Sequence, residues 1–184
     1  MPSLYLIRHA HADWSPDENC PLSARGHEAA ERVRGILQTY PIGAIYSSPY
    51  LRARQTVMPL AARLNLPVQI EPELRERQLG NYLGKDFFEA VRETWQNPSF
   101  AHPEGEANST AQARGLAALR RLQKEQAAEH IVLSTHGNLM ALVIQGFDPS
   151  IDFSFWKSLT MPDIYELSFS QAGKIDLKSR LWQE

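Results

Sequence analysis

The stretch Leu4-Tyr5-Leu6-Ile7-Arg8-His9-Ala10 decides the fold of this chain, because an uninterrupted apolar run ends in an arginine and a histidine. A short run that is apolar at both alternating positions predicts a strand buried on both faces of a largely parallel sheet. Ligands of such sheets bind at the carboxyl ends of the strands. Arg8 and His9 would therefore lie at the ligand edge, where a guanidinium can hold an anion and an imidazole titrates near neutral pH.

The composition indicates a globular chain with one domain spanning residues 1–184. Its 19 lysines and arginines stand against 21 acidic residues, a net charge of -2, and no basic run predicts a nucleic-acid partner. No apolar run approaches roughly 18 residues and no signal-peptide pattern is present, so we expect a cytoplasmic protein without membrane insertion. A single cysteine, Cys20, excludes an internal disulfide and a Cys-rich metal site.

Strand-like and helix-like segments alternate along the chain, which predicts an α/β three-layer sandwich. We expect a mostly parallel central sheet with helices on both faces and an antiparallel edge. The further expected strands are residues 44–46, 68–70 and 131–133, followed by an edge hairpin of residues 165–169 and 175–177 that turns at Gly173. Two helices are expected in the first half of the chain: one that Ser23 caps, and one after Pro49 that Pro59 kinks or restarts. A third is expected near residues 87–95, and a fourth begins at a capping box at residues 109–112 with Ser109 as cap. The last is expected from Leu139 to near Gly146.

Three predicted strand ends deliver polar side chains to one edge of this sheet. Arg8 and His9 follow the first strand, residues 47–52 follow the second, and His136 follows the strand at residues 131–133. Two arginines can hold the oxygens of a phosphoryl group, and a histidine nucleophile can divide phosphoryl transfer into two steps. His136 could donate a hydrogen bond to the same oxygens. The helix starts after Ser48 and Gly137 would add backbone donors for an anion.

The leaving oxygen needs an acid, and Glu76 is the best candidate. Glu71 and Glu73 lie nearby and are expected in a solvated loop. In the same way Arg54 competes with Arg52 for the second arginine position. His9 and His11 alternate on one strand and could suggest a metal site, but a third ligand at metal-like spacing is missing.

The chain resembles the histidine phosphatase superfamily, which has a phosphoglycerate-mutase-like fold. The matching segments, in family order, are Leu6-Ile7-Arg8-His9, residues 21–26, residues 47–56, Leu74-Arg75-Glu76 before Gly80, Pro103-Glu104-Gly105-Glu106, and Thr135-His136-Gly137-Asn138. Each motif alone is a weak signal, but together they cover most of the chain.

The resemblance implies a role for each matched residue. His9 would attack phosphorus and become phosphorylated. Arg8, Arg52 and His136 would form the phosphate pocket, with Asn138 as an additional contact. Glu76 would protonate the leaving group and then deprotonate the water that cleaves phosphohistidine. The implied enzyme is a phosphoric monoester hydrolase of the histidine acid phosphatase type, which acts on a phosphorylated small molecule and needs neither a metal nor a cofactor.

Departures from the family pattern favour hydrolysis over phosphoglycerate-type mutase activity. Ala10 replaces the usual glycine, the loop at residues 10–19 is short, and the chain lacks extra segments of the cofactor-dependent mutases. A cofactor-dependent mutase, a phosphoprotein phosphatase, a phosphate-binding module without turnover and a metal-dependent hydrolase stay open as alternatives. The motifs leave the substrate and the oligomeric state open.

The segment at residues 81–106 is expected to determine specificity. Aromatic side chains could line a substrate entrance, although most are expected in the core: Trp14, Tyr82, Phe87, Trp95 and Phe100. His102 lies in the same region and is expected to be a plain loop residue.

Overall fold

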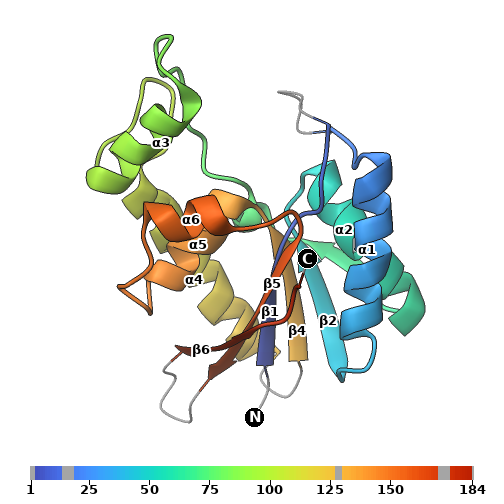
Figure 1. The fold of residues 1–184 in the computed structure, drawn as a ribbon. Coiled ribbons are helices and arrows are strands. Elements are labelled where there is room, and N and C mark those ends of the chain that lie inside the picture. The colour runs from blue at the N-terminus through green and yellow to red at the C-terminus, as the bar shows by residue number, and fades with distance from the viewer. Residues whose placement is uncertain (1–2, 14–18, 127–129, 170–174, 184) are drawn as a thin grey trace.

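A six-stranded sheet in the order β3-β2-β4-β1-β5-β6 forms the centre of the computed structural model (Figure 1). The structure describes residues 3–13, 19–126, 130–169 and 175–183. The strands are β1 (Ser3–Arg8), β2 (Ile42–Ser47), β3 (Val68–Ile70), β4 (His130–Thr135), β5 (Asp163–Phe169) and β6 (Ile175–Arg180). Strands β1 to β4 pair in parallel, whereas β5 runs antiparallel to β1 and β6 antiparallel to β5. The predicted parallel sheet with an antiparallel edge is confirmed.

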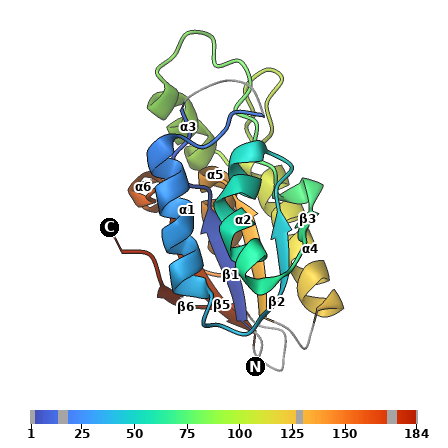
Figure 2. The same cartoon turned by 90° about the vertical axis from the view of Figure 1, so that its right-hand side faces the viewer.

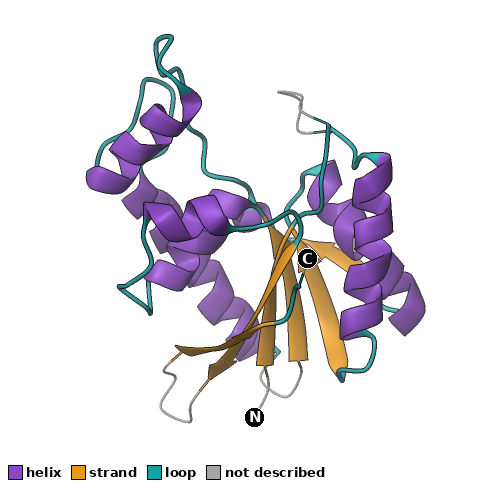
Figure 3. Cartoon of the chain, in the orientation of Figure 1, coloured by secondary structure: helices purple, strands orange, loops and turns teal. Residues whose placement is uncertain are grey.

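Helices cover both faces of this sheet, as Figure 3 shows. They are α1 (Ala24–Leu37), α2 (Leu51–Leu64), the 3-10 helix η1 (Pro72–Leu74), α3 (Phe87–Gln96), α4 (Asn108–Glu125), α5 (Gly137–Gln145) and α6 (Phe153–Ser158). Helices α1 and α2 lie together over one face (Figure 2), and α4 and α5 lie over the other. The predicted three-layer α/β sandwich is therefore confirmed. Among the described residues, no helix has the length and apolar character needed to cross a membrane.

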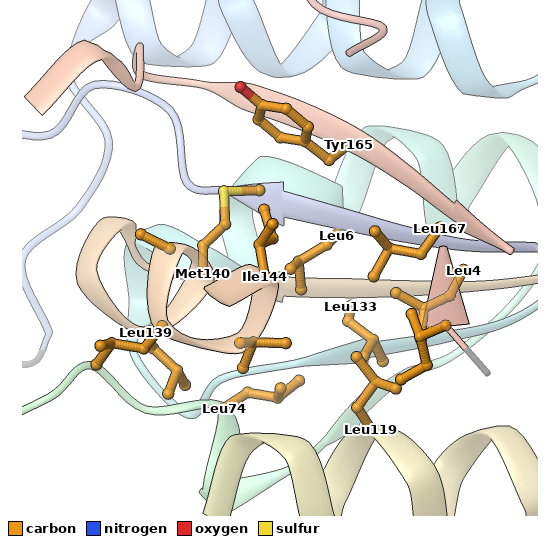
Figure 4. Packing of buried hydrophobic residues seen from close by; sticks show 14 of the residues in the cluster. Leu4, Leu6, Leu74, Leu119, Leu133, Leu139, Met140, Ile144, Tyr165 and Leu167 are labelled. Atoms are coloured by element: carbon orange, nitrogen blue, oxygen red, sulfur yellow. The ribbon is translucent and has the colours of Figure 1, made fainter. Parts of the chain in front are cut away.

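The alternation of side chains along β1 explains why one short run organises two cores. Tyr5 and Ile7 pack with residues of α1 and α2, including Val33 and Leu60. The intervening Leu4 and Leu6 belong to the opposite core, which Figure 4 shows around Leu6 and Met140. The side chains of these four β1 residues are at most 1% exposed. Burial on both faces is what an uninterrupted apolar strand predicts.

The capping prediction for α4 is wrong, and of the two outcomes expected at Pro59, a kink or a restart, the restart does not occur. Helix α4 begins at Asn108 after the cap position Ala107, which makes no side-chain cap hydrogen bond, so Ser109 lies inside the first turn instead of capping it. Helix α2 continues through Pro59 without restarting. Val57 and Leu60 on its inner face are fully buried. This packing offsets the roughly 3 kcal/mol that an interior proline costs.

Other local features show which elements the sequence pattern predicts and which it does not. Ser23 caps α1 as predicted, since its Oγ accepts the N–H of Gly26 at 3.2 Å. Helix α6 and η1 were not predicted, because six and three residues are too short to show a helical period. The predicted turn at Gly173 lies outside the described residues.

Gly80 joins the segment after η1 to the loop before α4. Its φ of +79° is left-handed, and a Cβ there would lie 2.4 Å from the carbonyl oxygen of Pro103. The two loops also exchange backbone hydrogen bonds, from Asn81 to Pro103 and from Glu106 to Gln78, each 2.8 Å long. Only a residue without a side chain allows this approach.

We predict that Gly80→Ala lowers the free energy of unfolding by about 2 kcal/mol or more, because positive φ and a backbone clash add together. Gly84→Ala is a matched control: its φ is +76°, but a Cβ there meets nothing within 4 Å. The control should cost about 1 kcal/mol for φ alone. Urea unfolding of the two variants measures the difference, and equal losses would contradict the role of the close approach.

Candidate active site

Arg8 stands at the carboxyl end of β1, in a position that several contacts define. Its Nη1 donates to the carbonyl oxygen of Leu159 at 2.7 Å. Its guanidinium lies against Gly137, where a Cβ would be 2.8 Å from Nε and 2.9 Å from Cζ. Burial lowers the pKa of Arg8, while the nearby charges of Glu76 and Asp163 oppose this shift. Its Nε is buried and has no hydrogen-bond partner among the described residues.

His9 presents one nitrogen as a lone-pair donor. Its backbone N–H continues the pairing with β4 through Thr135 at 2.9 Å. Nδ1 lies 2.7 Å from the carbonyl oxygen of Ala10, so Nδ1 carries the proton. Nε2 then accepts from Nε of Arg52 at 3.3 Å. Burial lowers the pKa of His9 to about 3, and the charges of Arg52 and Arg8 add to this effect, so the ring is neutral at pH 7.

The start of α2 holds Arg52 beside His9. Ser134 at the end of β4 donates its hydroxyl to the carbonyl oxygen of Ala53 at 2.8 Å. Thr56 donates to the carbonyl oxygen of Arg52 at 2.8 Å and accepts the N–H of Ala10 at 2.9 Å. Of the two competing arginines, Arg52 contacts the His9 ring, as the sequence motif implied.

His136 follows β4 and faces His9 across the pocket. Their ring centroids are 5.1 Å apart, with the planes inclined at 65°. Nε2 of His136 lies 2.8 Å from Oγ of Ser48, and Nδ1 is buried without a partner among the described residues. Burial lowers the pKa of His136 well below its usual value, and His9 and Arg52 contribute less. The ring is therefore neutral, with one nitrogen left for a ligand.

Glu76 closes the remaining side of the pocket. Its Oε2 accepts the N–H of Asn138 at 3.0 Å, and Oε1 accepts those of Leu139 at 2.9 Å and Arg77 at 2.8 Å. The carboxyl group thus lies at the N-terminus of α5, held in place by three backbone N–H groups. Thr135 holds the preceding segment by donating to the carbonyl oxygen of Leu74 at 2.7 Å.

The competing acids are engaged elsewhere. Glu71 is buried and pairs with Arg121, and Glu73 pairs with Arg75 at 3.1 Å. The structure therefore brings Glu76, and neither of its two acidic neighbours, to the side of Arg8.

Asn138 lies at the site, but its side chain is used for positioning. Its Oδ1 accepts Nε1 of Trp95 at 3.0 Å, and its Nδ2 lies 3.5 Å from Oδ1 of Asn108. These contacts tie the start of α5 to α3 and α4. The backbone N–H of Asn138, bonded to Glu76, is its closest link to the pocket.

A cavity of about 430 Å³ adjoins Arg8 and Glu76. Its wall includes Phe87 and Phe88 of α3 and Trp156 of α6. The expectation that most aromatic residues of this region lie in the core is wrong: Phe87 is 46% and Phe100 37% exposed, and Tyr82 and Trp95 are half-buried. Helix α3 extends beyond the sheet edge (Figure 1), and its buried residues, Ala90, Val91 and Thr94, lie on one face of the helix. Trp14 lies outside the described residues.

Arg77 is a site residue that sequence reasoning missed. It is 5% exposed and lines the cavity, and its Nε and Nη1 are buried without a partner among the described residues. Burial lowers its pKa, and the charges of Glu76 and Glu106 oppose this. Its position next to Glu76 was the only available signal, because a loop has no periodicity that shows which side chain points inward.

His11 and His102 have local partners. Nδ1 of His11 lies 2.8 Å from Oγ of Ser23, and His102 is buried with Nε2 3.1 Å from the carbonyl oxygen of Ala90. Within the described parts of the chain, no group of three His, Cys, Asp or Glu side chains is arranged to hold a metal ion.

Comparisons with known proteins place this chain among phosphatases and mutase-like proteins. The chain is 24% identical over 160 residues to an uncharacterized phosphatase, PhoE, of Bacillus subtilis, covering 82% of this chain and 81% of the relative. It is 28% identical over 155 residues to the adenosylcobalamin/alpha-ribazole phosphatase of Escherichia coli, covering 77% and 76%. The structure of a mycobacterial glucosyl-3-phosphoglycerate phosphatase shares the fold with a TM-score of 0.82, at 21% identity and 99% coverage of both chains.

The fold and the sequence relatives define a phosphatase or mutase-like enzyme. The model of the histidine phosphatase superfamily (branch 1) matches residues 4–175. The chain belongs to this superfamily, as the order of its motifs implied.

The low pKa of His9 predicts a pH-dependent stability. In the unfolded chain His9 is protonated below about pH 6.5, whereas in the folded chain it stays neutral down to about pH 3. Acidification between these two values therefore favours unfolding. His9→Asn should therefore flatten the fall in unfolding free energy between pH 6 and 4 by up to about 1.4 kcal/mol per pH unit. Denaturant titrations at several pH values measure this slope. The exposed His27→Asn is the control, and a wild-type slope in His9→Asn would contradict the assignment.

Replacement of Arg77 by an apolar residue is expected to stabilise the fold. Arg77→Met should raise the free energy of unfolding by about 1 kcal/mol, because a guanidinium whose Nε and Nη1 are buried without a partner among the described residues is replaced by an apolar chain. Glu106 keeps Arg114 at 2.7 Å and Glu76 keeps its backbone donors, so neither carboxylate loses a hydrogen bond. The more exposed Arg75→Met is the control. If Arg77→Met is the less stable of the two variants in thermal unfolding, the cost assigned to the buried charge is wrong.

Proposed function

We propose that residues 1–184 form one domain that hydrolyses small-molecule phosphomonoesters without a metal, through a phosphohistidine on His9. The observation that carries this proposal is the neutral His9 ring, with its proton on the Ala10 carbonyl side and its unprotonated Nε2 hydrogen-bonded to Arg52. The proposed enzyme is a phosphoric monoester hydrolase of the histidine acid phosphatase type. The one sheet that contains β1 to β6 supports the single domain.

In the first step, Nε2 of His9 attacks phosphorus in line and the bond to the leaving oxygen breaks. Arg8 and Arg52 supply positive charge to the phosphoryl oxygens. Ser48 accepts the N–H of Tyr50 at 3.3 Å, so its hydroxyl proton is available for Nε2 of His136. His136 then carries its own proton on Nδ1, the unpartnered nitrogen, and donates it as a hydrogen bond to a phosphoryl oxygen.

Glu76 transfers the proton that each step needs. Its Oε2 accepts one backbone N–H, whereas Oε1 accepts two, so we assign the mobile proton to Oε2. The protonated acid gives this proton to the leaving alkoxide. The resulting carboxylate then takes a proton from the water that attacks phosphohistidine, and the P–N bond breaks to release phosphate and restore His9.

Substitutions of His9 and Glu76 separate these roles. His9→Ala should lower kcat/KM by at least about 10³-fold for every ester. Glu76→Gln should lower kcat/KM about 10²-fold for ethyl phosphate but less than about tenfold for 4-nitrophenyl phosphate, because a good leaving group needs little protonation. Phosphate release measures both effects, with the exposed Glu89→Gln as control. Equal losses on the two esters would remove Glu76 from the acid role.

Mutase activity is the alternative that one relative supports, since the chain is 34% identical over 104 residues to phosphoglycerate mutase 1 of Saccharomyces cerevisiae, across 50% of this chain and 42% of the mutase. A mutase needs a phosphoenzyme that survives until a second hydroxyl competes with water. With phosphoglycerate as substrate, we expect phosphate release to exceed isomer formation, and we expect the rate to survive chelation of metal ions. Isomerisation with little phosphate release would favour the mutase.

A further inference from the structure

The cavity beside Arg8 and Glu76 adjoins both the proposed phosphate pocket and the proposed proton donor. Arg8 belongs to the proposed phosphate pocket, and Glu76 is the proposed proton donor to the leaving oxygen. The part of the substrate attached to that oxygen must therefore extend past Glu76 into this cavity. Its composition then describes the alcohol from which phosphate is removed.

The wall of this cavity is mainly apolar. Phe87 and Phe88 are each 46% exposed and Met161 is 43% exposed. They are three of the seven large apolar side chains that are exposed among the described residues. Concentration of such side chains in one hollow, instead of scatter over the surface, is typical of a ligand site.

The aromatic rings of the wall form one cluster. The centroids of Phe87 and Phe88 are 5.5 Å apart, and each lies about as far from Trp156, at 6.2 and 6.1 Å. Trp156 is buried and holds the two phenylalanines from beneath, with Val91 and Leu159 completing the wall. Phe87 and Phe88 stay half-exposed, with Nζ of Lys157 5.6 Å from the Phe88 ring centroid, so an aromatic or aliphatic ligand can cover the rest of their surface.

We propose that the substrate is a phosphomonoester of an alcohol with an aromatic or otherwise apolar body, which packs against Phe87, Phe88 and Trp156. This inference rests on the proposed phosphatase function and names its substrate class. The volume of about 430 Å³ suits a small molecule more than an extended peptide. The positive charges of Arg77 and Lys157 border the same cavity, so oxygen-bearing substituents of the alcohol also have donors there.

Esters of primary alcohols test the proposal, because their leaving groups are similar in basicity and differ in apolar surface. We compare kcat/KM for ethyl, hexyl and 2-phenylethyl phosphate with that for glycerol 3-phosphate. Each buried methylene should add roughly threefold to fourfold, so hexyl and 2-phenylethyl phosphate should exceed ethyl phosphate by at least about tenfold. Glycerol 3-phosphate should be no better than ethyl phosphate.

Variants of the wall locate the selectivity. In the double variant Phe87→Ala/Phe88→Ala, the ratio of kcat/KM for 2-phenylethyl over ethyl phosphate should fall at least about fivefold. Both side chains are half-exposed, so the fold should persist, and the thermal unfolding midpoint checks this. Phe100→Ala removes an exposed ring that lies outside the cavity and should leave the ratio unchanged.

Three results would overturn the inference. Equal kcat/KM values for ethyl and 2-phenylethyl phosphate would refute an apolar substrate while leaving the phosphatase intact. Preference for a phosphotyrosine peptide over all the small esters would assign the wall to a protein substrate. Absence of phosphate release from every ester, 4-nitrophenyl phosphate included, would refute the proposed function and this inference with it.

Discussion

The hydrogen bond between Nδ1 of His9 and the carbonyl oxygen of Ala10, 2.7 Å long, is the interaction on which the proposed chemistry depends. It places the ring proton on the side away from Arg52, and burial keeps the ring neutral. Without this bond a neutral imidazole could carry its proton on Nε2, where it would block attack on phosphorus. The backbone that supplies the carbonyl is fixed in turn, because the N–H of Ala10 donates to Thr56 on α2.

The end of β4 positions the segments that carry other residues of the pocket. Successive side chains of a strand point to opposite faces, and here both are hydroxyls that hold a neighbouring segment. Ser134 binds the first turn of α2, which carries Arg52, and Thr135 binds the end of η1, which leads to Glu76. One strand end therefore sets the separation between Arg52, the proposed phosphate ligand, and Glu76, the proposed acid.

Several buried polar atoms of the site have no partner among the described residues, namely Nε of Arg8, Nε and Nη1 of Arg77 and Nδ1 of His136. Such atoms cost stability in the free protein. A phosphate ester brings oxygens and negative charge, and so it can satisfy the donors near His9. This exchange of stability for preorganised binding is a general property of active sites.

The sequence was sufficient to predict those features that depend on an apolar period or on motifs in a fixed order. The double burial of β1, the edge hairpin and the meeting of Arg8, His9, Arg52, Glu76 and His136 around one pocket follow from such signals. The inward direction of Arg77 and the exposure of Phe87 do not, because a loop has no period and α3 packs by one face beyond the sheet. Helix α6 is too short to predict, yet it supplies Trp156 to the cavity. The sequence therefore predicts the residues of the proposed phosphoryl chemistry better than the cavity wall that would bind the alcohol part of the substrate.

The position of the phosphoryl group on the enzyme tests the account most directly. Rapid quenching during turnover of a ³²P-labelled ester, followed by peptide mapping and NMR of the phosphoenzyme, identifies the modified atom. The account predicts an acid-labile phosphoramidate on Nε2 of His9. A phosphoryl group on Nδ1 or on another residue, or phosphate release at full rate by His9→Ala, would contradict it.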